Sequence, residues 1–198
     1  MPVAIPPALI APTSEATDLS ARLLSKTPAV RSAAVEEVLR HPDAVDPFDY
    51  APVVQWLWES GRRRHAAFWF YLFQERTRPW ALADRRGDAA AALRSSLNDG
   101  LGRLINGWIA SDVAAWQKIA SRAIAYEKRF PLYRARPPGL DQAAWTALVA
   151  RSRDEYDRQA GEAFAGMKAD EMAAARRANG LPVGPLDAPG PALPEAWR

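Results

Sequence analysis

The sequence predicts an all-α fold, either a single-domain helical bundle or an irregular array of helical hairpins, with about six helices. Along most of the chain, apolar residues recur at spacings of three and four, which is the period of an amphipathic helix. Pro, Gly and Asp residues separate these stretches where helices commonly begin or end. We find no convincing run of the alternating pattern that a half-buried strand requires.

Length and composition indicate one sizeable globular domain. The chain has 198 residues, of which 48% are hydrophobic and 25% charged, and these values are ordinary for such a domain. Residues 1–13 are expected to be an extended arm, residues 14–180 the helical domain, and residues 181–198 a flexible tail rich in Pro and Gly. Deleting the tail beyond Pro182 is expected to leave the stability nearly unchanged, unless Leu193 or Trp197 docks on the body.

The chain is expected to be cytoplasmic, with no membrane contact. It has no cysteine, which excludes disulfides, thiolate catalysis, zinc–thiolate sites and iron–sulfur clusters and fits a reducing compartment. The first residues are apolar but carry no Lys or Arg before Arg22, and four prolines interrupt them, so a secretory signal is not favoured. No uninterrupted apolar run reaches the length of a membrane span.

Helices in the first quarter are predicted from caps and prolines. A short turn starts at Asp18, and a helix follows Thr27-Pro28, an N-cap followed by proline at the first helical position. His41-Pro42 ends that helix. Asp49 is the expected cap of the next helix.

The stretch WLWESGRRRHAAFWFYLFQERTR, residues 56–78, is the centre of the predicted fold. It holds three of the eight tryptophans and three phenylalanines. We expect one helix to end near Ser60, a turn at Gly61, and a second helix from about Arg62 to Thr77, stopped by Pro79. The second helix is apolar nearly all round, as is typical of a helix in the middle of a domain.

Three further helices are predicted downstream. One begins at Asp88 and carries an apolar stripe through Trp108. The next is capped by Ser111 or Asp112 and ends before Pro131. A long helix then starts at Asp141 and continues to Asn179, with Gly161 and Gly166 as points where it bends.

The central hairpin resembles the tetratricopeptide-like helical hairpins, in their shorter Sel-type form. The matching features are Trp56-Leu57 in the first helix, Gly61 at the joint, and Ala66-Ala67 followed by Phe68-Trp69 in the second. The resemblance covers about 25 residues, and no fixed period repeats it. The segments FWFYLFQ, GRLINGW and ARRANGL also resemble uncharacterised bacterial all-helical proteins. The hairpin resemblance implies a protein-binding surface; the alternative is a hydrophobic hairpin that anchors a bundle core.

Arginines around this hairpin form the densest charge feature. From Arg62 to Arg86 there are seven arginines against two acidic residues. Guanidinium groups make bidentate bonds with carboxylates and phosphates, so one interpretation is a docking patch for an acidic partner. The other is a solvated turn with intramolecular ion pairs. The candidate partner-binding residues are Arg62, Arg63, Arg64, Trp58, Arg76, Arg78, Arg85 and Arg86.

Other titratable residues do not form a convincing site. Glu37 and His41 have the i,i+4 spacing of metal ligands, but Pro42 ends the helix between them and the acidic residues that follow. The acidic residues of the last long helix alternate with arginines, which predicts i,i+3 and i,i+4 ion pairs. Nucleotide-binding and hydrolase motifs are absent from the sequence. No cofactor, metal or catalytic residue is therefore expected.

The sequence favours a protein that binds another protein and has no catalytic activity. The most concrete version is an inhibitor or immunity-type protein that binds a bacterial toxin or effector, and this version rests on size, the lack of catalytic motifs and the Arg/Trp-rich surface. The alternatives are an enzyme or small-ligand binder with a pocket between helices, and a nucleic-acid-associated accessory protein. The net charge of +3 and the lack of a reader motif do not favour nucleic acid. A homo-oligomer is compatible with the sequence.

Overall fold

The computed structural model describes residues 14–83, 89–130, 136–137 and 139–197. Within these residues the chain forms eight α-helices and three short 3₁₀ turns, and no strand, which confirms the all-α prediction. The α-helices are α1 (Ser14–Leu23), α2 (Pro28–Arg40), α3 (Tyr50–Glu59), α4 (Arg63–Ala83), α5 (Ala89–Ile109), α6 (Val113–Glu127), α7 (Gln142–Gly166) and α8 (Ala169–Ala178). The 3₁₀ turns are η1 (Pro42–Ala44), η2 (Pro47–Asp49) and η3 (Glu195–Trp197). Expectations for residues 1–13 lie outside the described residues.

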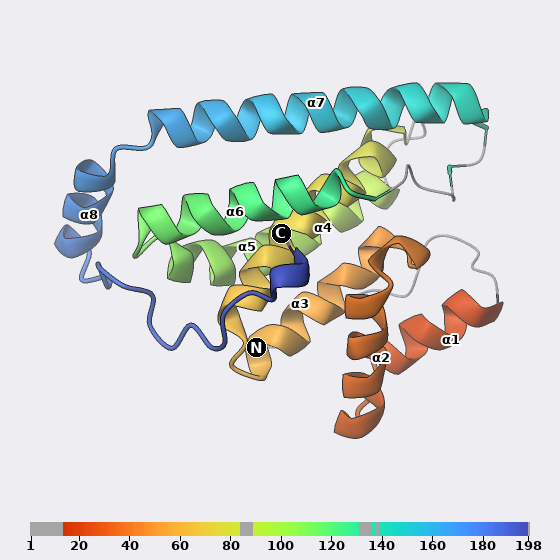
Figure 1. Ribbon diagram of the computed structural model, residues 1–198, viewed down its shortest axis with the longest axis horizontal. Coiled ribbons are helices and arrows are strands. Elements are labelled where there is room, and N and C mark those ends of the chain that lie inside the picture. The colour runs from red at the N-terminus through yellow and green to blue at the C-terminus, as the bar shows by residue number, and fades with distance from the viewer. Residues whose placement is uncertain (1–13, 84–88, 131–135, 138, 198) are drawn as a thin grey trace.

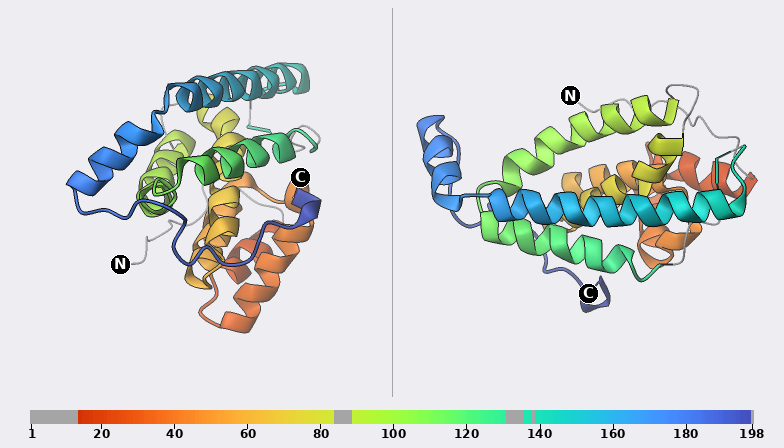
Figure 2. Two further views of the ribbon diagram at one scale, coloured as in Figure 1. Left: turned by 60° about the vertical axis from the view of Figure 1, so that its left-hand side comes forward. Right: turned by 90° about the horizontal axis from the view of Figure 1, so that it is seen from above.

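Helix α4 is the centre of the molecule (Figure 1). It packs against α3, α5, α6 and α7, while α2 packs against α3 and α1 against α2. Seen from above, α7 crosses the molecule between α5 and α6 (Figure 2). The part of the chain that the structure describes contains no helix that is both long and apolar enough to cross a membrane.

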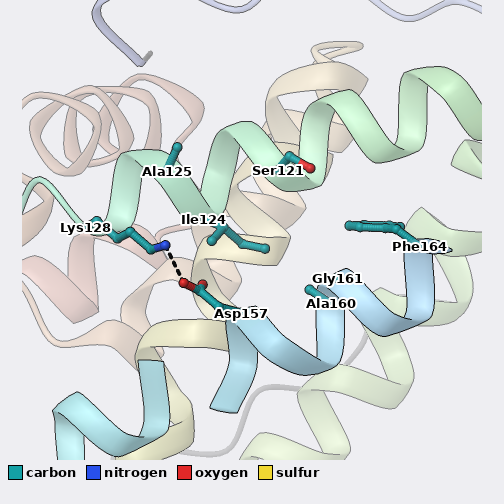
Figure 3. A pocket seen from close by; sticks show the side chains of 8 residues that line it. All are labelled: Ser121, Ile124, Ala125, Lys128, Asp157, Ala160, Gly161 and Phe164. Carbon is teal, nitrogen blue, oxygen red and sulfur yellow. Dashed lines mark ion pairs between the residues drawn. The ribbon is translucent and has the colours of Figure 1, made fainter. Parts of the chain in front are cut away.

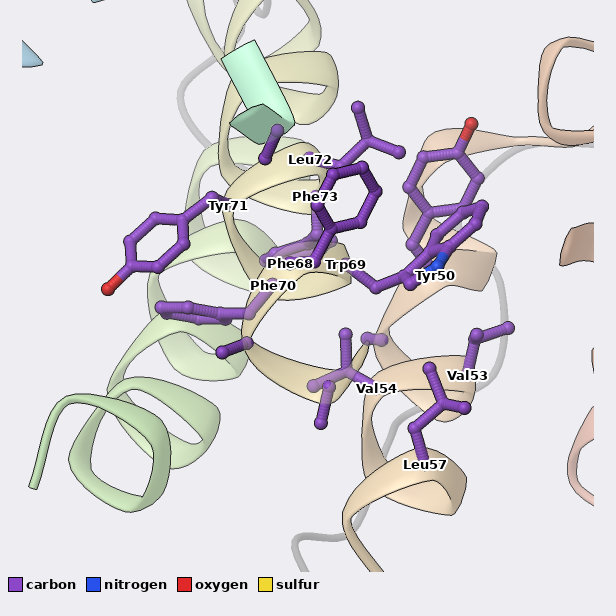
Figure 4. Close-up of a cluster of buried hydrophobic side chains, with 14 of the residues drawn as sticks. Tyr50, Val53, Val54, Leu57, Phe68, Trp69, Phe70, Tyr71, Leu72 and Phe73 are labelled. Carbon is purple, nitrogen blue, oxygen red and sulfur yellow. The ribbon is translucent and has the colours of Figure 1, made fainter. Parts of the chain in front are cut away.

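The hairpin of α3 and α4 forms the hydrophobic core. Gly61 has a φ of 75°, its N–H donates to the Trp58 carbonyl, and the Arg62 N–H donates to the Leu57 carbonyl. These two bonds are a Schellman C-cap, which needs a residue that tolerates positive φ. Side chains from α3 then face the aromatic run of α4 (Figure 4), and Trp69, Phe70 and Phe73 are fully buried. Burial of each such side chain contributes about 1.5–3 kcal/mol to folding.

Pro79 does not stop α4, contrary to the sequence prediction, because the helix continues to Ala83. A proline inside a helix removes one backbone hydrogen bond, so this last turn needs packing to hold it. Trp80 provides it: it is buried and meets Trp145 of α7 edge-on, with ring centroids 5.3 Å apart. With Val149, these two residues form a second, smaller hydrophobic cluster.

The predicted single helix from Asp141 to Asn179 is two helices, and this part of the prediction was wrong. Helix α7 is capped by Asp141, whose side chain accepts a bond from the Ala144 N–H. It ends at Gly166, and Met167 and Lys168 are extended before α8 begins. Glycine costs about 1 kcal/mol in a helix relative to alanine. Gly166 and most of its neighbours are exposed, so little packing offsets that cost.

The predicted cap Asp49 turned out differently, whereas Asp112 acts as predicted. Asp49 precedes α3 but makes no capping bond; its carboxylate accepts from the Ser20 hydroxyl, at 2.9 and 3.0 Å. Asp46 instead caps η2 by accepting from the Phe48 N–H. Asp112 caps α6 as predicted, through the Ala115 N–H.

Candidate functional site

Residues 181–197 form an ordered strap across the molecule rather than a tail that leaves it. We call these residues the C-terminal strap. The strap runs from the end of α8 past the N-terminal end of α4 to α6 (Figures 1 and 2). Early along it, the Gly184 N–H donates to the Ser111 carbonyl. Trp197 at its other end is only 6% exposed and belongs to the main hydrophobic core.

The strap covers the arginines that were predicted as a free docking patch. The Arg63 guanidinium donates to the carbonyl of Asp187 at 3.1 Å and pairs with its carboxylate at 3.3 Å. The main-chain N–H of Arg64 donates to the Pro189 carbonyl at 3.0 Å, and its side chain reaches the Gly190 carbonyl at 3.5 Å. Both arginines are thus committed to the protein's own chain.

Arg62 and Trp58 flank the strap. Arg62 pairs with Glu36 of α2 at 2.9 Å. Trp58 is half-buried, with the Arg63 guanidinium 5.1 Å from its ring centroid. Its ring meets Trp108 of α5 edge-on at 5.7 Å, and the Trp108 indole N–H donates to the Asp187 carbonyl at 2.7 Å. The residues at this end of the hairpin therefore make one continuous surface beneath the strap.

Two of the remaining predicted patch residues, Arg76 and Arg78, do not join this surface. Arg76 is 1% exposed and pairs with Glu127 of α6, so it is an interior residue and its assignment to a docking patch was wrong. Arg78 donates to Gln159 of α7 at 2.8 Å. Arg85 and Arg86 lie outside the described residues. One helix places Arg64 and Arg76 more than three turns apart, which explains why they do not meet.

His65 links the helix to the strap as a neutral imidazole. Its Nε2 lies 2.9 Å from the Ala192 carbonyl, and its Nδ1 lies 3.3 Å from the Arg62 guanidinium. A carbonyl only accepts and a guanidinium only donates, so Nε2 carries the proton and Nδ1 accepts. Burial lowers the pKa of His65, and the charges of Arg62 and Arg64 act in the same direction.

Two arginines, Arg122 of α6 and Arg129 in the turn after it, bind the far end of the strap. Arg122 donates to the carbonyls of Trp197 at 3.0 Å, Leu193 at 3.4 Å and Pro194. Arg129 donates to the Ala196 carbonyl at 3.0 Å. Sequence reasoning missed both residues. The available signal was weak: the two arginines are seven residues apart, one in α6 and one in the turn after it.

Trp197 fills an aromatic seat. Its ring stacks on Phe68 with centroids 5.0 Å apart and planes 18° apart. It also meets Trp69 at 5.6 Å and His65 at 4.9 Å, both edge-on. Aromatic pairs in these geometries contribute about 0.5–1.5 kcal/mol beyond the area that they bury. Phe68, Trp69 and His65 all come from the first two turns of α4, the same end that carries the arginines.

A second polar region lies between α4, α6 and α7. Arg76 and Arg153 both pair with Glu127, which is fully buried, at 3.1 and 2.8 Å. Glu75 is 2% exposed, and neither of its carboxyl oxygens has a hydrogen-bond partner among the described residues. Burial raises the pKa of Glu75 to about 9, with smaller contributions from the charges of Glu127 and Asp157. The Glu75 carboxyl is therefore protonated at neutral pH.

A pocket of about 420 Å³ opens beside this region, between α6 and α7. Figure 3 shows Ile124 of α6 and Phe164 of α7 along its walls and the Lys128–Asp157 ion pair at one end. Small residues such as Ala160 and Gly161 make up much of the remaining lining.

Of the residues weighed as metal ligands, Glu37 has another partner. Glu37 pairs with Arg22 at 3.0 Å, and the described residues contain no group of three potential ligands suited to a metal ion. On α7, Arg158 pairs with Glu155 and Glu162 at spacings of three and four. These two pairs confirm the prediction for that helix.

Comparison of the chain with models of protein families, with curated proteins and with solved structures finds no match. The kinship of the α3–α4 hairpin with tetratricopeptide-like hairpins therefore stays a prediction.

Proposed function

We propose that this chain acts by binding another protein through the surface of the helical body that its C-terminal strap covers. We call this surface the groove. The observation that carries the proposal is the way the strap is held. Six side chains of the helical body donate hydrogen bonds to its main-chain carbonyls: Arg63, Arg64, His65, Trp108, Arg122 and Arg129. Contact with main-chain groups, together with pockets for a few side chains, is how proteins recognise extended peptides.

The charge of the groove favours a partner segment that has an acidic residue at one position. Arg63 pairs with the Asp187 carboxylate, which is 83% exposed. A segment that replaced the strap would meet the same guanidinium there, so an acidic residue at that position would be favoured. In its most concrete form, the proposed partner is a bacterial toxin or effector that the chain inhibits.

The proposal is tested with three full-length baits used for affinity purification from the source organism. The first is the wild type, the second carries Gly190→Ala and Trp197→Ala to free the groove, and the third adds Arg122→Ala and Arg129→Ala. We expect a stoichiometric partner to be enriched by the second bait relative to the first and lost with the third. Equal recovery by all three would place the binding surface elsewhere and overturn the proposal.

A second candidate function is the binding of a small molecule in the pocket between α6 and α7. The observation that favours it is the Lys128–Asp157 pair at the edge of an apolar pocket, beside the buried Glu75 carboxyl. A ligand in this pocket should raise the melting temperature of the wild type, and Asp157→Ala should remove that shift. A metabolite screen by thermal shift without any such difference would exclude this candidate.

A further inference from the structure

At two positions of the strap, Trp197 and Gly190, the size of the side chain decides the fit. The first is Trp197, which stacks on Phe68 and meets the edges of His65 and Trp69. The ring is 6% exposed, so the seat matches a flat bicyclic side chain. A small residue would leave the seat empty, and the apolar contacts with three aromatic rings would be lost.

The second position is Gly190, where the strap crosses the α3–α4 turn backbone to backbone. A Cβ atom at Gly190 would lie 2.4 Å from the Gly61 carbonyl oxygen and 3.1 Å from the Arg62 Cα. Gly190 also has a φ of 72°, a backbone conformation that residues with a side chain rarely adopt. Gly184, earlier in the strap, has a positive φ as well but nothing within 4 Å of a Cβ. At Gly190, unlike at Gly184, the body also leaves no room for a side chain.

Between these two positions the body contacts mainly main-chain atoms, and Leu193 is the one residue whose side chain packs, half-buried, against the core. His65 binds the Ala192 carbonyl, and Arg122 binds those of Leu193 and Pro194. The side chains of Pro191, Ala192, Pro194, Glu195 and Ala196 are exposed. Prolines suit this stretch because they favour an extended chain and bring no N–H that needs a partner.

From this arrangement we infer the class of ligand: an extended, proline-containing segment with a glycine and, seven residues later, a tryptophan, as in GPALPEAW of the strap itself. This inference rests on the proposed function, because it names the partner segment that the same groove would bind. In the free chain, the strap is the intramolecular competitor for that segment. A covalently attached competitor acts at an effective concentration of the order of millimolar, so a partner gains access when the strap is released.

The test measures the binding of fluorescein-labelled peptides to the full-length chain by anisotropy. The host carries Gly190→Ala and Trp197→Ala, which release its own strap and leave the groove unchanged. The peptide spans residues 187–197, and three variants of it carry Trp197→Ala, Gly190→Ala or Glu195→Gln. The last is the matched control, because Glu195 is exposed.

We expect the parent peptide and the Glu195→Gln peptide to bind alike, and the Trp197→Ala and Gly190→Ala peptides to bind at least tenfold more weakly. The wild-type host should bind the parent peptide at least tenfold more weakly than the released host. A Trp197→Ala peptide that binds within twofold of the parent overturns the inference, as does a released host that is folded by circular dichroism and binds no peptide. If the double variant does not fold, Gly190→Ala alone serves as host and should still bind more tightly than the wild type.

Failure of this inference and failure of the proposed function give different results. If the peptides do not bind as expected but the three baits still differ in partner recovery, the groove binds a segment with another sequence pattern. If neither experiment shows a difference, both proposals are wrong. A wild-type chain that forms concentration-dependent dimers, lost in the Trp197→Ala variant, would identify a second copy's strap as the occupant and overturn the separate partner.

Discussion

Two segments from the last third of the chain cover α4, the strap at its N-terminal end and α7 at its C-terminal half. The strap presents carbonyls to side chains of the body, and Trp197 is its one deeply buried side chain. Helix α7 is held instead through its own side chains, with Arg153 on the buried Glu127 and Trp145 on Trp80. A segment held by its main chain can be exchanged for another of similar shape, whereas one held by paired charges is specific to its partner.

The largest expected loss of stability comes from breaking the buried ion pairs between α7 and the body. Glu127→Ala leaves Arg76 buried without the carboxylate that it shares with Arg153, and we expect a loss of about 3–5 kcal/mol. Chemical denaturation measures it. The control is Glu155→Ala, which removes an ion pair at the surface of α7 and should change the stability far less, because exposed ion pairs contribute little. Similar losses for the two variants would show that the buried pair has no special weight.

On the strap side, one side chain should account for most of the stabilisation. Trp197→Ala removes the ring from its seat on Phe68 and should cost about 3 kcal/mol. A loss of this size would contradict the expectation from the sequence that the residues beyond Pro182 can be deleted with little change in stability. Trp197→Phe keeps an aromatic ring and should cost about half as much or less. Thermal and urea melts of the two variants provide the measurement, and an unchanged midpoint for Trp197→Ala would mean that the strap adds nothing to the fold.

Glu75, in the polar region between α4, α6 and α7, should make the free energy of unfolding depend on pH. Its folded-state pKa of about 9 lies above the ordinary value of 4.5, so the folded chain binds more protons than the unfolded chain between these values. Its contribution is therefore fully present below pH 4.5 and is lost as the pH rises through 9. Glu75→Gln should remove this slope and be more stable than the wild type at pH 9, by at least about 1.4 kcal/mol.

The control for this measurement is Glu162→Gln, at an exposed position of α7, which should keep the slope of the wild type. Burial also raises the pKa of Asp49, to about 6 from 3.8. Both variants should therefore keep a smaller loss of stability as the pH rises from about 4 to 6. A pH profile of Glu75→Gln that overlays the wild type would show that Glu75 is ionised in the fold.

The smallest effect should come from the arginines that the sequence emphasised most. Arg63→Ala removes an ion pair to an exposed carboxylate and a contact with the Trp58 ring. Exposed pairs contribute up to about 1 kcal/mol, so the urea midpoint should shift slightly, and less at high salt. A loss above about 2 kcal/mol would mean that the strap is held by charge rather than by Trp197.

These contrasts explain which features the sequence could predict. Apolar periodicity predicted the α3–α4 hairpin with its turn at Gly61, because burial and φ preference are local properties of the residues. Arg64 and Arg76 looked alike in the sequence, but their surroundings differ. The interior place of Arg76 depends on Glu127, a residue 51 positions away.

The strap was misjudged for a different reason. Its composition indicates little apolar area to bury, and a flexible tail was predicted for this reason. The body recognises mainly its carbonyls, which every residue has and no composition reveals. Pro79 was misjudged similarly, because the packing of Trp80 on Trp145, and not the local preference of proline, decides where α4 ends.

The position of the α3–α4 hairpin also has a consequence for how fast the chain folds. Its two helices are adjacent in sequence and share a tight turn, so their contacts close a short loop at little entropic cost. The contacts of the strap span long stretches of sequence, 75 positions between Arg122 and Trp197, and form later in a search governed by topology. Folding should therefore nucleate on the hairpin. Loss of the strap should then appear as faster unfolding, with the rate of refolding nearly unchanged.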